Sequence, residues 1–221
     1  MPTTIRSSLD REFALIRDDL LRMGYLVDGA IERAMQSLNA QDTDLARQVI
    51  NDDAVINELR FKVEEECLRL IATQQPAAGD LRTAMAVVSI VTDIERMGDH
   101  ATGIAKTVIR VGQATPARPL ADLTPMADAA RKMFRDGLDA YVARDAEAAR
   151  RVAAEDDIVD AMYKKLFDEL VALMARDPAN VAPGTYLLWC GHNLERLGDR
   201  VTNIAERIIF MTTGTLKELN V

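Results

Sequence analysis

A stretch of seventeen residues occurs twice in this chain, 100 residues apart, and this repeat constrains the fold more than any other feature. DIERMGDHATGIAKTVI fills positions 93–109, and NLERLGDRVTNIAERII fills positions 193–209. Eight of the seventeen paired positions are identical. An earlier segment is also duplicated, since VINDDAVIN at 49–57 aligns with VAAEDDIVD at 152–160. Self-similarity of this kind indicates one structural unit used twice.

The spacing of apolar side chains predicts a protein built from helices. Aromatic residues make up only 5% of the chain, and it has none of the alternating apolar–polar runs that mark half-buried strands. Apolar positions recur every three or four residues over about 5–38, 45–71, 81–111, 120–143, 146–176 and 185–211. Long helices joined by short turns pack as antiparallel neighbours. We therefore predict an all-α fold of two tandem, pseudo-symmetric three-helix bundles with six long helices.

Turn residues separate the predicted helices and divide the chain into two domains. Asp42 and Asp80 are predicted as N-caps of the second and third helices, because aspartate accepts hydrogen bonds from the first free backbone N–H groups. Gly112–Pro119 combines glycine with two prolines and is the clearest linker in the chain. We accordingly predict one three-helix repeat over 1–114 and a second over 115–221.

Composition and charge argue against several classes of protein. The net charge is −8 and the pI is near 4.9, whereas nucleic-acid binding requires a basic face. No apolar run approaches the ~20 residues that span a bilayer, and the N-terminus lacks the apolar segment of a signal peptide. Cys67 and Cys190 lie inside helical patterns, as reduced and buried thiols do. We expect a cytoplasmic protein.

The repeated stretch carries two carboxylates four residues apart in each copy, Glu95 with Asp99 and Glu195 with Asp199. Residues at that spacing share one face of a helix, and like charges there repel each other by a few tenths of a kcal/mol. A positive group should therefore face each pair, either a basic side chain or a bound cation.

The helical hairpin of each half places further oxygen ligands at the height of these carboxylates. Folding the chain back about Pro76 brings Asn57 level with Glu95, and folding it back about Asp177–Pro178 brings Asp160 level with Glu195. Carboxylate and amide oxygens suit divalent metals, and helical bundles hold iron or manganese in this way. The candidate metal ligands are Asp53, Asn57, Glu95 and Asp99 in the first half and Asp156, Asp160, Glu195 and Asp199 in the second.

Simpler interpretations of the same residues stay open. An interhelical salt-bridge network could neutralise the carboxylates through Arg96, Arg196 or Arg200. His192 shares a face with Glu195 and is either a further ligand or a partly exposed helix residue.

Two glycines inside the predicted helices call for a reason of their own. Gly98 and Gly198 each cost a helix about 1 kcal/mol relative to alanine, which indicates close approach of a ligand, another backbone or a tightly packed helix.

The motif Glu-Arg-x-Gly-Asp at 95–99 and 195–199, each followed by Ile-Ala, closely resembles the doubled signature of the PhoU family. The segment QPAAGDLR at 75–82 resembles that family too, and the resemblance covers essentially the whole chain. It implies two similar three-helix bundles that bind metal at the acidic motifs, with iron or zinc as the typical ions and manganese or magnesium as alternatives. Asn57 departs from the motif where an aspartate would complete the pair, although its carbonyl oxygen can still act as a ligand.

The same resemblance implies a non-enzymatic, negative regulator of phosphate uptake and of the phosphate-starvation response. Its expected partners are the ATPase subunit of the phosphate ABC transporter and a sensor histidine kinase, with membrane association through those partners alone and homodimerisation as a further expectation. Two alternatives differ in class. One is a metal-dependent oxidase or phosphohydrolase that uses the clustered carboxylates, and the other is a helical adaptor without metal.

Overall fold

The computed structural model describes residues 3–111 and 121–219, and the predicted linker at 112–119 lies outside the described residues. All regular elements in these two ranges are helical. They are α1 (Thr3–Ala40), α2 (Thr43–Gln74), α3 (Ala78–Val111), α4 (Thr124–Ala143), α5 (Ala146–Ala154), α6 (Asp156–Arg176), the 3₁₀ turn η2 (Pro178–Asn180) and α7 (Val181–Thr213).

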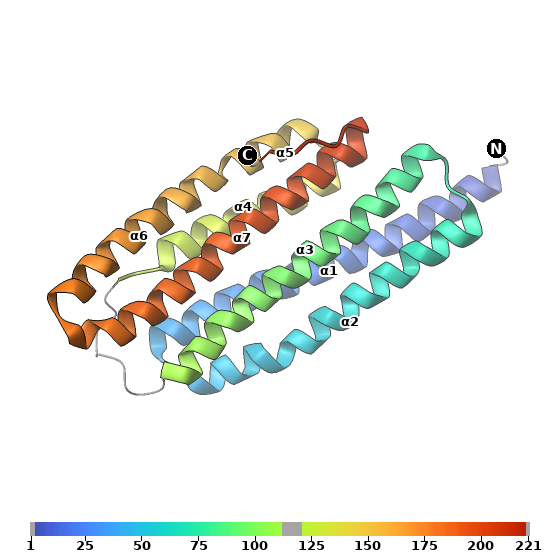
Figure 1. The fold of residues 1–221 in the computed structure, drawn as a ribbon. Helices are drawn as coiled ribbons and strands as arrows, with labels where there is room; N and C mark the ends of the chain where they lie inside the picture. Colours follow the sequence, from blue (N-terminus) through green and yellow to red (C-terminus); the bar gives the residue numbers. More distant parts are fainter. Residues whose placement is uncertain (1–2, 112–120, 220–221) are drawn as a thin grey trace.

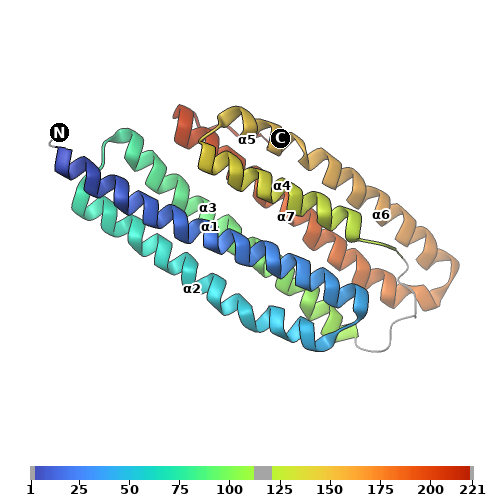
Figure 2. The ribbon, with the colours of Figure 1, turned by 180° about the vertical axis from the view of Figure 1, so that it is seen from behind.

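Two three-helix bundles lie side by side, which confirms the predicted architecture (Figure 1). The first contains α1, α2 and α3, and the second contains α4, α7 and the broken helix formed by α5 and α6. Figure 2 shows α1 beside α4 on one face, and α3 and α7 meet along the middle of the molecule. The α3–α7 pair is the most extensive helix contact in the described part of the chain. The duplicated helix therefore joins the two halves.

The turn between the first two helices is built in the same way in both halves. Gln41 and Arg144 each adopt a left-handed backbone conformation, with φ of 53° and 51°. The next residue caps the following helix in each case: the Asp42 carboxylate accepts the N–H groups of residues 44 and 45, and Asp145 accepts those of residues 147 and 148. The N-cap predicted at Asp42 is confirmed.

The predicted N-cap at Asp80 is wrong, because α3 begins two residues earlier. The backbone N–H of Leu81 already donates to the carbonyl of Ala77 at 2.8 Å, so helical hydrogen bonding starts there. Asp80 lies inside the first turn, where a negative charge favours the positive end of the helix dipole.

Two other helix starts also differ from the prediction, each at a proline. The fourth helix begins at Thr124 instead of 120, with Pro125 in its first turn. The last helix begins at Val181 instead of 185, and Pro183 lies in its first turn. Proline is tolerated there because the N–H groups of the first turn have no helical acceptor. α4 is therefore shorter at its start than predicted, and α7 is longer.

The fifth predicted helix is interrupted at Glu155, which separates α5 from α6. The N–H of Glu155 donates to the carbonyl of Val152, and the N–H of Ile158 donates to the carbonyl of Glu155, both at 3.0 Å. These short-range bonds replace the regular helical ladder for one turn. The break immediately precedes Asp156, which is only 2% exposed.

Polar contacts across the α3–α7 junction follow the repeat. Asp93 accepts hydrogen bonds from Arg200 at 3.4 Å and Asn203 at 3.2 Å. Its counterpart Asn193 has its Oδ1 3.0 Å from Nδ1 of His100. The contact between residues 93 and 200 is therefore matched by one between the equivalent residues 193 and 100.

The interior of both bundles is apolar, and no helix within the described ranges has both the length and the apolar character to cross a membrane. Ile94 and Leu194, which occupy equivalent repeat positions, are completely buried. Both cysteines are buried free thiols, and burial raises the pKa of Cys67 and Cys190 to about 12. They are therefore protonated and unreactive at neutral pH.

Candidate metal centre

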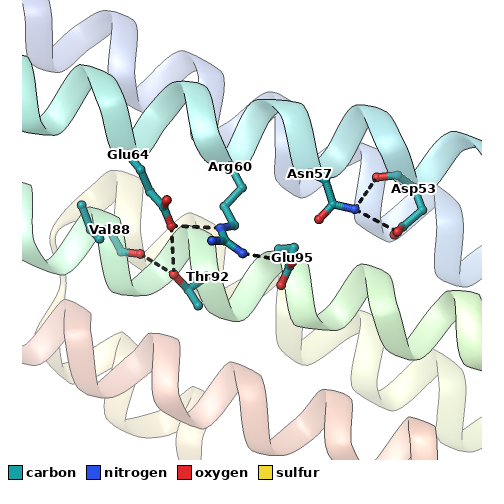
Figure 3. A network of polar contacts seen from close by, with 7 residues as sticks. All are labelled: Asp53, Asn57, Arg60, Glu64, Val88, Thr92 and Glu95. Atoms are coloured by element: carbon teal, nitrogen blue, oxygen red, sulfur yellow. Dashed lines mark hydrogen bonds and ion pairs between the residues drawn. The ribbon is translucent and has the colours of Figure 1, made fainter.

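In the first half, an arginine from α2 reaches the acidic motif on α3 (Figure 3). Arg60 donates from Nη1 to Glu95 at 3.1 Å and from Nε to Glu64 at 2.9 Å. Thr92, one turn before Glu95, donates to the carbonyl of Val88 at 2.9 Å and lies 3.5 Å from Glu64. Glu95 thus has a permanent counter-charge on the neighbouring helix.

Asp53 and Asn57 lie on the same face of α2, one turn apart. The Asn57 amide donates to the Asp53 carboxylate at 3.0 Å and to its backbone carbonyl at 3.1 Å. Burial, followed by repulsion from Asp99, raises the pKa of Asp53, while the Asn57 amide opposes the rise. Asp53 and Asp99 are therefore close enough to interact, as the level hairpin predicts. The other oxygen of Asp53, Oδ1, is buried without a hydrogen bond in the described structure.

Each glycine of the motif faces the first aspartate of its site. A Cβ atom at Gly98 would lie 3.3 Å from Asp53 Oδ1, and one at Gly198 would overlap with Asp156 Oδ1. Close approach of an aspartate side chain from the adjacent helix therefore explains both glycines. The contact is tighter in the second half.

The second half brings its carboxylates together without an arginine from the facing helix. Burial, then repulsion from Asp199, raises the pKa of Asp160. The same two causes raise the pKa of Glu195, to which Asp160 adds repulsion. His192 Nδ1 lies 3.3 Å from Glu195 Oε2. Within the described residues that buried oxygen has no hydrogen bond, so the histidine contact is an ion pair at most.

The predicted salt-bridge network is present in part. Arg196 pairs with Asp199 of its own helix at 2.7 Å, with 39% of its side chain exposed. Arg200 turns away from the motif and pairs with Asp93 across the junction. The arginine that reaches a motif from a facing helix is Arg60, which the sequence interpretation did not include.

The two halves fit a cation differently. Within 3–111 and 121–219, no three His, Cys, Asp or Glu side chains are grouped closely enough to hold a metal ion. In the first half, Arg60 already binds Glu95 and residue 57 is a neutral amide, so fewer anionic ligands remain for a cation, although Asp53 keeps one buried oxygen without a hydrogen bond. In the second half, Asp160 and Glu195 repel each other and Glu195 has an orphaned buried oxygen, which a cation would satisfy. His192, with 57% of its side chain exposed, lies at the edge of that group.

Alanine at the two motif glycines provides a test of this packing. Overpacking costs about 1–3 kcal/mol, whereas alanine gains a helix about 1 kcal/mol over glycine. We expect Gly198→Ala to lower the free energy of unfolding by about 1–2 kcal/mol, and Gly98→Ala to change it by less than about 1 kcal/mol. Urea denaturation of both variants measures the difference. Equal effects would contradict the tighter approach of Asp156 to its glycine.

Neutralising Glu195 should stabilise the metal-free protein. Because the pKa of Glu195 is raised in the folded state, the native protein binds this proton more tightly than the unfolded chain does. Its ionisation therefore destabilises the fold above the raised pKa, and the penalty disappears as the pH falls towards the model-compound value of 4.5. In chelator at pH 7, we expect Glu195→Gln to increase the free energy of unfolding by roughly 0.5–1 kcal/mol.

The matched control is Glu95→Gln, which should lower stability because it removes the acceptor of Arg60. Denaturation of both variants between pH 4 and 8 gives the comparison. A destabilising Glu195→Gln at pH 7 would show that this carboxylate is already neutralised within the protein.

Comparison with known proteins identifies the family to which this geometry belongs. The family model described as the PhoU domain matches the chain twice, over residues 20–108 and 123–208. The chain belongs to the PhoU family. Both matched segments include one acidic motif and the helix that faces it, so each PhoU domain carries one of the two sites.

Relatives of the PhoU family align over almost the entire chain. The phosphate-specific transport system accessory protein PhoU homolog of Clostridium acetobutylicum is 38% identical over 97% of this chain and 99% of its own. The homolog of Rhizobium meliloti is 37% identical over 95% of this chain and 89% of its own.

Solved structures of the family share the fold. The phosphate transport system regulatory protein PhoU from Streptococcus pneumoniae superposes with a TM-score of 0.87 at 33% identity, covering 96% of this chain and 100% of that one. PhoU from Pseudomonas aeruginosa gives a TM-score of 0.88 at 36% identity, covering 93% and 99%. These PhoU proteins are named accessory or regulatory proteins, in agreement with the prediction that this chain is not an enzyme.

Proposed function

We propose that this chain is the regulatory accessory protein of a phosphate-specific transport system. In this role it restrains phosphate uptake and the phosphate-starvation response in the cytoplasm, by docking to the transporter's ATPase subunit and to a sensor histidine kinase. The observation that carries the proposal is membership of the PhoU family along almost the full chain, with relatives named as accessory proteins of that system. The oxidase or phosphohydrolase alternative loses its support, because the relatives are named as regulators.

The proposal includes a metal ion in the second half, held by residues of α6 and α7. Its ligands would be Asp156, Asp160, Glu195 and Asp199, and iron or zinc is the expected ion, with manganese or magnesium as alternatives. Such an ion supplies positive charge to carboxylates that otherwise repel each other across two helices. It would thereby fix the spacing of α6 and α7 on the surface that these helices present to a partner.

Direct binding tests the regulatory role. The immobilised ATPase subunit and the cytoplasmic part of the kinase are each exposed to the wild-type protein and to Glu195→Gln/Asp199→Asn, in zinc or in chelator. We expect the wild-type protein to bind both partners, and chelator or the double substitution to weaken binding. Deletion of the gene should release phosphate uptake in phosphate-rich medium.

The possible results separate the proposal from its alternatives. Absence of binding to either partner, together with unchanged uptake in the deletion strain, would refute the regulatory role. Binding that is equally tight in zinc and in chelator would favour the metal-free helical adaptor.

A further inference from the structure

The counter-charge that faces Glu95 belongs to the protein itself. Arg60 lies between Glu95 and Glu64, at 3.1 and 2.9 Å, and only 25% of its side chain is exposed (Figure 3). Glu95 is still more enclosed, with 14% of its side chain exposed. Both acidic partners raise the pKa of Arg60, while its partial burial opposes this. The guanidinium therefore binds Glu95, one of the four predicted metal ligands of the first half.

At the position equivalent to Arg60, the second half has a group without a permanent positive charge. In the alignment that pairs Asp53 with Asp156, Arg60 corresponds to Tyr163. Tyr163 lies beside the His192 ring, with ring centroids 6.0 Å apart, and the nearby Glu195 adds to the rise of its pKa. A neutral phenol thus faces Glu195 where a guanidinium faces Glu95.

We infer that Arg60 acts as a built-in cation that replaces the metal ion of the first half, so that the two acidic motifs of this chain have separate roles. Glu95 of the first motif is neutralised by a permanent ion pair, and the second motif remains open to a metal. This inference rests on the metal site of the proposed function, but it concerns residues that the proposal does not use. A bound cation and the guanidinium would compete for Glu95 and repel each other.

Asn57 supports the same division. Asparagine is neutral, so Asp53 and Asn57 carry one negative charge less than Asp156 and Asp160 do. The missing carboxylate at position 57 and the guanidinium at position 60 both lower the affinity of the first half for a cation. Two nearby positions on α2 therefore differ from the second half in the same electrostatic direction.

The test places tyrosine, the residue of the second half, at position 60 of the first half. The parent is Glu195→Gln/Asp199→Asn, in which the second motif is disabled, and Arg60→Tyr is added to it. Both proteins are titrated with Mn²⁺ alone, and binding is measured as the loss of the electron paramagnetic resonance signal of free Mn²⁺. We expect the parent to bind little Mn²⁺. Arg60→Tyr should lower its dissociation constant at least about tenfold, and adding Glu95→Gln should remove that gain.

Two results would overturn the inference. One is no gain of Mn²⁺ binding from Arg60→Tyr in a folded protein. The other is a parent that binds Mn²⁺ tightly and loses it with Glu95→Gln, since the first half would then bind metal despite Arg60. Helical circular dichroism shows whether Arg60→Tyr folds. If it does not, Arg60→Gln removes the charge with a smaller change of volume and gives the same two outcomes.

A double-mutant cycle supplies a readout that does not involve metal. Arg60→Met and Glu95→Gln are expected each to lower the melting temperature, and together to lower it by less than the sum. Additive effects would show that the pair is not coupled and would contradict the role of Arg60. Both tests are independent of partner docking, so a failure of the proposed regulatory role would not be mistaken for a failure of this inference.

Discussion

Replacing Arg200 with methionine is expected to lower the free energy of unfolding by about 3 kcal/mol, because it leaves a buried carboxylate without its charged partner. Arg200 and Asp93 pair across the α3–α7 junction, and each side chain is only 14% exposed. Burial already raises the pKa of Asp93, and the hydrogen bonds from Asn203 and Arg200 oppose that rise. Without the guanidinium, one amide would remain as its hydrogen-bond donor.

The matched variants separate charge from packing. Asp93→Asn should cost less than Arg200→Met, since Arg200 is long enough to turn its charge towards water. The double variant Arg200→Met/Asp93→Asn should recover much of the loss, because it leaves no buried charge. Urea denaturation at pH 7 measures all three proteins. A loss below about 1 kcal/mol for Arg200→Met would place this pair among ordinary surface ion pairs.

Truncation of the repeated core position should have an effect of similar size in both halves. Ile94 and Leu194 are completely buried on α3 and α7. Alanine at such positions typically costs about 2–5 kcal/mol through lost burial and the cavity left behind. We expect about 3 kcal/mol for each variant, in a single unfolding transition, because α3 and α7 form the most extensive helix contact in the described chain.

Calorimetry and urea denaturation followed by two probes test this expectation. Tyr25→Ala on α1 is the control, since that side chain is 74% exposed and should change stability little. Two separate transitions in Ile94→Ala or Leu194→Ala would contradict the view that the junction makes the two halves one cooperative unit.

The fold could be predicted from the sequence because the repeat and the apolar spacing agree. Both halves show the same order of helices, and the turns at Gln41–Asp42 and Arg144–Asp145 are duplicates of each other. Helix starts were harder to predict. Pro125 lies inside the helix predicted from 120 and Pro183 precedes the one predicted from 185, yet each lies in the first turn of its helix. Proline is tolerated both there and in loops, so it does not by itself mark the first residue of a helix.

The candidate site was predicted in outline but not in its electrostatics. Folding each helical hairpin back on itself predicts Asp53 near Asp99 and Asp160 near Glu195, and both pairs of carboxylates repel each other in the structure. Arg60 is missing from the predicted site because it lies on α2, outside the repeated stretch that carries the acidic motif. The signal was available, since Arg60 lies three residues after Asn57 and thus on the same face of its helix, and alignment of the halves pairs it with a tyrosine.

Metal content is the measurement that tests the central claim most directly. Elemental analysis is made on protein purified without chelator, as the wild type, as Glu195→Gln/Asp199→Asn and as Glu95→Gln/Asp99→Asn. The account predicts iron or zinc in the wild type, its loss from the first variant and its retention in the second. A wild type without metal, or equal loss from both variants, would contradict a single open metal site in the second half.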